Sequence, residues 1–457
     1  MTLPFDLRRV QRRTLILLMV SQVVGSIAVT LTFAVSGILA AELAGSSGAA
    51  GLAQATLILG AGAASYLLAT LMNRKGRRGG LVAGYLIGAI GAGTCVVAAT
   101  TESFILLIAG MGALGASSAS TNSCRYAVTD LAPEDRRATT LSMVVWVATV
   151  GAVLGPLMVG PAQAVSTRLG LHPLAGPLLV DMTGALIAAL VIFSLLRPDP
   201  LIIARTLGRP TGHQAERHRV RPQRHASPLG PGIAALMLAN ATMVAVMVMT
   251  PLEMHHQGAA HTAIGAALSA HFLGMYAFAP LSGILSDRAG VPTALVTGGA
   301  VLLVSLVVLV GWFGQSPFTH GLGLFLVGLG WSVCTVAASS HIAAGSMGDT
   351  RMQGAADTAM TVMAAAAAAA AGPLMALWGF NGLLALAAVM STGIPLAAHR
   401  IQPQKAPLTT PEGLISRTPH LPLRRAAARP LRTLGVLPQT GADQIAPGLK
   451  GTDHDRT

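Results

Sequence analysis

Three ionisable side chains stand inside long apolar segments of this sequence, where a charge is costly. They are Asp181, Glu253 and His271, and His255 follows Glu253 closely. Ionisable groups in such segments are functional candidates by default. A carboxylate that holds first a proton and then a cationic substrate can couple the fluxes of the two. An imidazole changes its charge near neutral pH and could do the same. These residues therefore predict reversible protonation, with His271 as the best single candidate because it lies deepest.

Each of these residues also fits an ordinary structural role. Asp181 follows Pro177 and fits a helix cap. Glu253 and His255 fit hydrated residues at an outer opening, and His271 fits a hydrogen-bonded packing residue. Both interpretations stay open at this stage.

The motifs of enzymatic and ATP-driven chemistry are absent from the sequence. It contains no Walker loop, no Gly-x-Ser-x-Gly, no His-Glu-x-x-His and no Cys-x-x-Cys. The three cysteines stand singly in apolar surroundings, and the adjacent His255 and His256 point apart on a helix. We therefore expect neither an enzyme nor a metal or cofactor site, and energy for any work must come from a gradient.

The composition is that of a membrane protein. Hydrophobic residues make up 53% of the chain, charged residues only 10%, and the mean hydropathy is +0.64. A soluble protein carries about a quarter charged residues, whereas a spanning helix needs roughly 20 apolar ones. Lipid offers no partner to an unpaired backbone group, so the spans must be helices. We predict twelve, at 14–39, 49–71, 80–99, 103–127, 139–162, 176–196, 231–254, 262–284, 292–313, 320–343, 354–377 and 380–398.

The basic residues predict how these spans are oriented. If the amino terminus lies inside, every Lys and Arg except Arg125 and Arg168 falls in an inner loop or tail. This is the distribution that the positive-inside rule favours. We therefore place both termini in the cytoplasm and the chain in the cytoplasmic membrane. The net charge of +13 then indicates anionic lipid as a partner, not nucleic acid.

Two basic loops repeat along the chain. The stretch 69–78 and the stretch 283–290 each follow a predicted span, and Arg74 and Gly76 in the first correspond to Arg288 and Gly290 in the second. A repeat of this length in an apolar chain predicts two similar membrane halves, which is typical of secondary transporters. We divide the chain into an N-terminal bundle (1–196), a basic cytoplasmic linker (197–230) with one interfacial turn near 201–204, a C-terminal bundle (231–400) and a disordered tail (401–457).

Glycine and proline also recur at corresponding places in the two halves. Predicted span five contains Gly151, Gly155, Pro156 and Gly160, and predicted span eleven contains Gly372 and Pro373. Proline removes a backbone hydrogen bond and lets a helix bend. We expect a bend at both places that could serve a rocking motion; a passive kink that only suits packing is the alternative.

The basic loops resemble a known signature. Positions Leu71, Arg74, Gly76, Arg77, Arg78 and Leu81 match the loop 2–3 motif of the major facilitator superfamily, and 283–290 is similar to its second copy. The run from Gly151 to Gly160 is similar to the span-five motif of the drug–proton antiporter branch. The resemblance covers about residues 14–400. It implies two pseudo-symmetric six-helix bundles and a transporter that works as a monomer.

In that family the loop motif locks the cytoplasmic ends of the two bundles in the outward-facing state. By resemblance, the gate residues of this chain are Asn73, Arg74, Gly76, Arg77, Arg78, Gly283, Asp287, Arg288 and Gly290, with Asp130 and Asp357 as acidic partners. Asp287 is expected to face the amino terminus of a following helix or a basic group, where negative charge is favoured. Arg74, Arg77 and Arg288 are expected to pair with the acidic partners. The alternative is that these arginines serve only topology and lipid binding.

This sequence departs from the family pattern in two ways. Asn73 and Ala69 replace the usual Asp and Gly of the first loop, so the first latch should be weaker or use a neutral hydrogen bond. Met111 stands where the antiporter branch usually has an intramembrane Arg, four residues before Gly115. Arg125 lies too far along the helix to substitute simply, although it remains a coupling candidate.

The sequence therefore favours a secondary transporter that moves a small amphipathic or drug-like molecule by alternating access, with proton-coupled efflux as the preferred mode. The direction rests on the resemblance to the antiporter branch. Uptake or uniport of a metabolite is the first alternative. A membrane sensor that keeps the transporter fold without transport is the second.

Overall fold

The computed structural model describes residues 6–45, 48–207, 228–311, 316–346 and 348–401. Most of the predicted linker and nearly all of the predicted tail lie outside these residues. Within them the chain is helical. The helices are α1 (Leu7–Ala44), α2 (Gly48–Thr100), α3 (Phe104–Ala127), η1 (Glu134–Arg136), α4 (Arg137–Arg168), α5 (Ala175–Leu195), α6 (Pro200–Leu207), α8 (Leu229–His256), α9 (His261–Tyr276), α10 (Ala279–Ala289), α11 (Val291–Leu309), α12 (Pro317–Gly345) and α13 (Thr350–Ala398).

Ten stretches of the described chain are helical, long and apolar enough to cross a membrane. The number is lower than the twelve predicted spans because α2 and α13 each extend over two of them. Both contain one glycine with non-helical backbone angles, Gly76 (φ 85°, ψ 170°) and Gly379 (φ 68°, ψ 179°). Positive φ is readily adopted by glycine, which lacks a Cβ.

Helix α2 doubles back at Gly76. In a straight helix, Leu68 and Gly84 would be separated by about 24 Å. In the structure, Leu68 Cδ1 lies 2.5 Å from the place that a Cβ on Gly84 would occupy. The two arms of α2 therefore lie side by side, and Gly76 stands at the turn between them.

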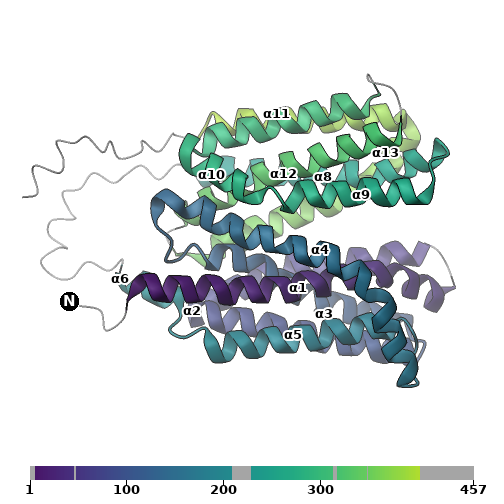
Figure 1. Ribbon diagram of the computed structural model, residues 1–457, viewed down its shortest axis with the longest axis horizontal. Helices are drawn as coiled ribbons and strands as arrows, with labels where there is room; N and C mark the ends of the chain where they lie inside the picture. Colours follow the sequence, from purple (N-terminus) through teal and green to yellow (C-terminus); the bar gives the residue numbers. More distant parts are fainter. Residues whose placement is uncertain (1–5, 46–47, 208–227, 312–315, 347, 402–457) are drawn as a thin grey trace, which may run out of the picture. The chain divides into compact units, whose positions relative to one another are not determined.

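The helices form two groups, which Figure 1 shows as separate sets of ribbons. Helices α1–α5 pack mainly on one another, and α8–α13 do the same; we call them the first and second bundle. Small residues bring backbones together inside the bundles, as is common in membranes. A Cβ on Gly60 of α2, for example, would lie 2.1 Å from the Gly112 carbonyl oxygen of α3.

Two glycines of predicted span five, Gly151 and Gly155, serve close packing, whereas Gly160 has no atom within 4 Å of an added Cβ. A Cβ on Gly151 of α4 would lie 2.2 Å from Ser26 Cβ of α1, and the Thr30 hydroxyl donates to the Gly151 carbonyl at 2.9 Å. Gly155 has equally little room beside Thr30. Helix α4 continues through Pro156 and Gly160, and α13 continues through Gly372 and Pro373. The non-helical position in α13 is Gly379, which lies beyond predicted span eleven, and the bend at the Gly-Pro pairs stays a prediction.

The interfacial turn that we predicted near 201–204 is a short helix, α6. Leu201 and Ile203 are buried, whereas Ile202 is 53% exposed. Helix α6 is therefore held on the protein by one apolar face.

Candidate functional site

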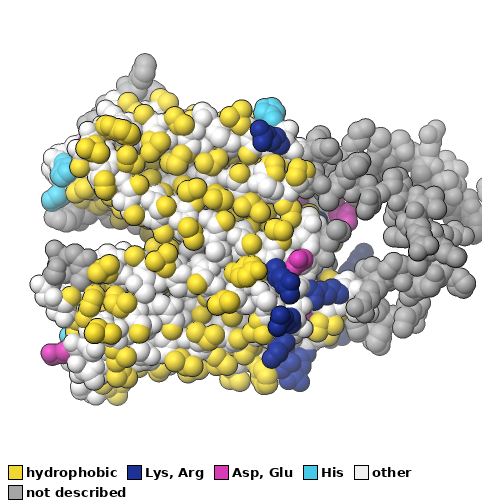
Figure 2. Space-filling model, turned by 180° about the vertical axis from the view of Figure 1, so that it is seen from behind, with side chains coloured by type: hydrophobic (Ala, Val, Ile, Leu, Met, Phe, Trp, Pro, Cys, Tyr) yellow, Lys and Arg dark blue, Asp and Glu magenta, His cyan; other side chains and the backbone are white. Residues whose placement is uncertain are grey.

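Basic residues gather at one end of the helices, as the dark blue side chains in Figure 2 show. We call this the basic end; it carries Arg74, Lys75, Arg78, Arg136, Arg137, Arg197, Arg205 and Arg288. The surface between the two bundles is indented at the opposite end in the same view. The hydrogen bonds that join the bundles in the described residues lie between the basic end and the middle of the helices, and they form the candidate site.

The first contact is built on the buried guanidinium of Arg77. Its Nε and Nη2 donate to the two carboxylate oxygens of Asp130 at 2.8 and 2.9 Å. Such a bidentate pair fixes geometry as well as charge. Nη2 also donates to Gln353 Oε1 of α13 at 2.8 Å, so Arg77 ties the first bundle to the second. Burial raises the pKa of Asp130, and the Arg77 guanidinium opposes that shift.

A second buried ion pair crosses between the bundles. Arg125 Nη2 of α3 donates to Asp357 Oδ1 of α13 at 2.5 Å, and the Tyr126 hydroxyl donates to the same oxygen at 3.1 Å. The Arg125 guanidinium also lies over the Tyr126 ring. Asp357 was predicted as a gate carboxylate, but its partner is Arg125, which we had predicted only as a coupling candidate. The structure places Arg125 in the contact between the bundles.

Helices α10 and α4 make the next contact. The carboxylate of Asp287 accepts the backbone N–H of Ala138 at 2.9 Å and of Thr139 at 2.7 Å. These groups belong to the first turn of α4, where unpaired N–H groups favour a negative charge. Helix α4 lies before Asp287 in the sequence. Asp287 therefore does not face the amino terminus of the helix that follows it in the chain, as we had expected. Gly283 allows the approach, because a Cβ there would lie 2.7 Å from Thr139 Cα.

The first arm of α2 meets α13 in the corresponding way. The Thr350 hydroxyl donates to the Ala69 carbonyl at 2.6 Å, and the Thr358 hydroxyl donates to the Gly62 carbonyl at 2.7 Å. A Cβ on Gly354 would lie 2.3 Å from Ala69 Cβ. The glycine that the first loop lacks at position 69 is therefore matched by a glycine on the facing helix.

The two loops share one backbone conformation. Gly76 has φ 85° and ψ 170°, and Gly290 has φ 87° and ψ 156°. The side chains around them differ, however. Asp287 reaches a helix terminus of the other bundle, whereas the Asn73 side-chain oxygen accepts from Arg205 of α6. The sequence repeat is thus present in the backbone, and the two contacts use different chemistry.

The remaining arginines of the loop motif lie at the surface. Arg74 and Arg288 are exposed, and no carboxylate of the described residues lies within ion-pair distance of either. The pairing that we predicted for them is therefore not present. Arg78 Nε donates to the Phe193 carbonyl at 2.8 Å, and its guanidinium stacks on the Phe193 ring.

The predicted coupling residues lie apart from this site. Asp181 of α5 is fully buried; its Oδ2 accepts from the Thr32 hydroxyl at 2.5 Å, and its Oδ1 has no partner in the described residues. His271 of α9 is equally buried, and its Nδ1 donates to the Leu324 carbonyl at 2.8 Å. Glu253 accepts from Gln257 at 2.7 Å, and His255 is exposed. These residues stand on three different helices.

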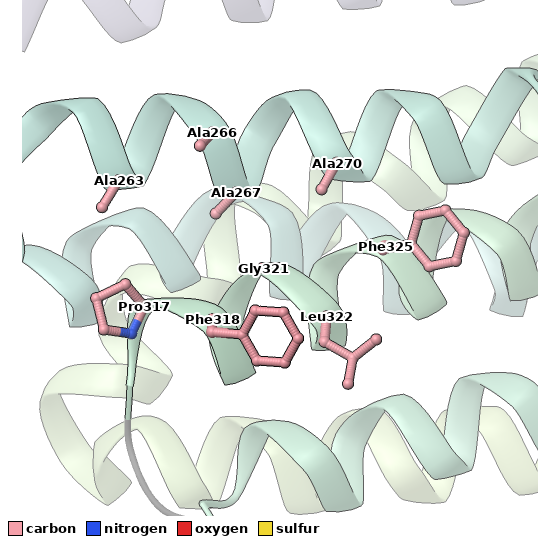
Figure 3. Close-up of a pocket in the computed structure, with 9 residues that line it drawn as sticks. All are labelled: Ala263, Ala266, Ala267, Ala270, Pro317, Phe318, Gly321, Leu322 and Phe325. Atoms are coloured by element: carbon pink, nitrogen blue, oxygen red, sulfur yellow. The ribbon is translucent and has the colours of Figure 1, made fainter.

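An apolar groove of about 430 Å³ lies between α9 and α12 (Figure 3). Its walls are the alanine face of α9 and Phe318, Leu322 and Phe325 of α12. Phe318 is 77% exposed, so this groove opens on the outer surface of the second bundle and is separate from the contacts between the bundles.

Sequence reasoning missed several residues of the site, among them Thr350, Thr358 and Gly354 of α13. Gln353 and Tyr126 take part in the two ion-pair clusters, and Arg205 contacts Asn73. Tyr126 adjoins Arg125 in the sequence, which is a local signal. Gln353 and Arg205 carry no signal of their own, because their partners lie far away along the chain.

The family follows from comparison with known proteins. The sequence model of the protein family described as Major Facilitator Superfamily matches residues 18–252 of this chain. The chain is also 31% identical over 393 residues to a Bacillus subtilis protein named uncharacterized MFS-type transporter YdeG, covering 85% of this chain and 91% of that protein. This chain belongs to the Major Facilitator Superfamily. It is a membrane transporter and not an enzyme.

Two further similarities concern a relative and the fold. The riboflavin transporter RfnT of Brucella anthropi is 26% identical over 338 residues, covering 72% of this chain and 80% of that protein. The superfamily transporter FucP, solved in the outward conformation, matches with a TM-score of 0.62 at 15% identity, covering 85% of this chain and 98% of that one. The latter likeness concerns the all-helical transporter fold alone.

Proposed function

We propose that this superfamily member moves a small amphipathic molecule across the cytoplasmic membrane by alternating access, with proton-coupled efflux as its mode. The observation that carries the proposal is the pair of corresponding contacts, α2 with α13 and α4 with α10, that join the bundles at the basic end. Two such contacts around one axis act as a hinged closure. Opening them while the opposite end closes would expose a central space to each side in turn.

The proposal includes twelve crossings and a fixed orientation. Helix α2 has 53 residues and α13 has 49, so each would be over 70 Å long if straight, roughly twice the thickness of the hydrocarbon core. Two crossings by each of these helices raise the ten candidates to twelve. The basic end lies in the cytoplasm under the positive-inside rule, and the exposed arginines there meet anionic lipid.

Asp181 is our preferred proton carrier. It is fully buried, and one of its carboxylate oxygens has no hydrogen-bond partner in the described residues, which leaves an acceptor free for a proton. His271, Glu253 and His255 remain candidates. The Nδ1 hydrogen bond of His271 to a backbone carbonyl is equally suited to a packing role.

Flux into proteoliposomes under an imposed pH gradient tests the mode. The probes are ethidium, a drug-like cation, and riboflavin. We expect pH-driven ethidium flux in the wild type and its loss, by about tenfold or more, in Asp181→Asn, because an amide cannot carry the proton. Glu102→Gln changes an exposed loop carboxylate and should leave the flux unchanged.

Each other outcome selects an alternative. Flux that follows the gradient of the probe and ignores pH would favour uniport and remove proton coupling. Riboflavin flux without ethidium flux would favour the metabolite carrier, which the similarity to RfnT supports. A protein that binds a probe but moves neither would favour the sensor.

A further inference from the structure

Helix α6 begins against the turn of α2. Asp199 Oδ1 accepts the backbone N–H of Leu201 at 3.0 Å and so caps α6, while Asp199 Oδ2 accepts the N–H of Arg78 at 2.8 Å. A Cβ on Gly76 would lie 2.5 Å from the same Oδ2. Gly76 therefore allows the turn of α2 and also leaves room for the Asp199 carboxylate, which attaches α6 to that turn. These contacts attach α6 to the first bundle.

From α6, the Arg205 side chain forms hydrogen bonds with both bundles. Its Nη1 donates to the Asn73 carbonyl at 2.7 Å, and its Nη2 donates to the Asn73 side-chain oxygen. The same Nη2 donates to the Gly348 carbonyl at 2.8 Å. Gly348 belongs to the connection between α12 and α13, so this bond crosses from the first bundle to the second. The planar fork of donors on an arginine suits such a three-acceptor arrangement.

The corresponding contact of the second loop, between α10 and α4, uses a different residue at the position that matches Asn73. There, Asp287 provides a negative charge for the amino terminus of α4. At the corresponding place, Asn73 has no charge, and the amino terminus of α13 is capped by its own Asp349, whose Oδ1 accepts the N–H of Arg351 at 3.0 Å. Position 73 is thus not needed as a helix cap, and its oxygen is available to a donor.

We propose that Arg205 is a gate residue, and that helix α6 of the linker supplies, through position 73, a closing contact to the second bundle in place of the helix-terminus contact that Asp287 makes in the second loop. Arg205 and α6 travel with the first bundle, because Asp199 and Asn73 hold them there. The bond to Gly348, together with the packing of Leu201 near Gly348, breaks when the basic end opens. The two sides of the gate therefore differ: one is a carboxylate on a helix terminus, and the other is an arginine from the linker.

Distance measurements between two spin labels test this proposal. The labels are placed on cysteines introduced at Lys75 and Arg351, both of which are exposed; the native cysteines are buried. In the full chain, Arg205→Gln should lower the ratio of closed to open molecules at the basic end about tenfold. This appears as a larger share of long distances between the two labels. Arg205→Lys keeps the charge without the fork and should give an intermediate shift.

Arg136→Gln is the matched control. It removes an arginine from the same end, where Arg136 lies exposed beside Asp135 and makes no ion pair across the bundles with any described residue. It should leave the distances unchanged. A distance distribution in Arg205→Gln equal to that of the control would overturn the proposal.

A double mutant separates a gate role from a general loss of structure. In Asn73→Ala, Arg205 loses one acceptor, so the effects of Asn73→Ala and Arg205→Gln should be less than additive. Full additivity would contradict a shared contact. The inference rests on the proposed alternating access, but the distances are measured without substrate. A failed flux assay therefore leaves the distance result intact, and an unchanged distance leaves the proposed transport standing.

Discussion

At the scale of single residues, the basic end is held by charges that are buried and paired. Arg77 is 1% exposed and binds both Asp130 and Gln353, and Arg125 is paired with Asp357. Removing one member of a buried pair leaves the other without compensation, which typically costs about 3–5 kcal/mol. The residues that matter are therefore the buried arginines, not the exposed ones of the same motif.

We predict that Arg77→Gln lowers the thermal unfolding midpoint of the purified protein, because Asp130 is left buried without its cation. Arg74→Gln, which alters an exposed arginine three residues away, should keep the wild-type midpoint. Arg77→Lys should fall between them, since lysine keeps the charge but loses the bidentate geometry. Equal midpoints for Arg77→Gln and Arg74→Gln would show that the buried pair contributes nothing.

The sequence could predict which residue types gather at the gate but not which ones pair. Asp130, Asp357 and Arg77 were all candidates from the loop pattern. The pairing of Asp357 with Arg125 depends on where α3 and α13 cross, which no local pattern encodes. The same reason hides Arg205: its contact with Asn73 requires the path of the chain after α5.

At the scale of helices, the bundles meet through small residues that let backbones touch. Gly283 faces α4, and Gly354 faces Ala69 of α2. From sequence alone, Ala69 was a departure from the family pattern, and its compensation by Gly354 becomes visible only when the facing helix is known. The turn at Gly76, in contrast, could be predicted, because a glycine in a basic loop between two apolar segments carries its own signal.

We predict that Gly354→Leu keeps the basic end from closing. The new side chain would meet Ala69 and the Ser65 carbonyl, which lie 2.3 and 2.7 Å from the added Cβ. A cysteine introduced at the buried Ser65 should then react faster with a membrane-impermeant maleimide applied from the basic side. Gly160→Leu adds the same side chain where no atom lies within 4 Å and should not alter the reaction. Slow labelling in both variants would argue against close helix contact as part of the gate.

At the scale of the whole molecule, the account rests on two bundles that are joined at one end and can exchange that contact for one at the other end. The repeat predicted the two halves, and the apolar pattern predicted most of the membrane helices. The interruption of α2 at Gly76 falls between two predicted spans, as the basic loop predicted. The direction of transport depends on energy coupling, which neither pattern nor packing encodes.

Paired distance measurements at both ends test the central claim most directly. One label pair stands at residues 75 and 351 of the basic end, and the other at the exposed residues Arg168 and His256 of the opposite end. Breaking the gate with Arg77→Gln should lengthen the first distance and shorten the second in the same molecules. If both distances lengthen together, or if the second stays fixed while the first changes, the bundles do not alternate and the account is wrong.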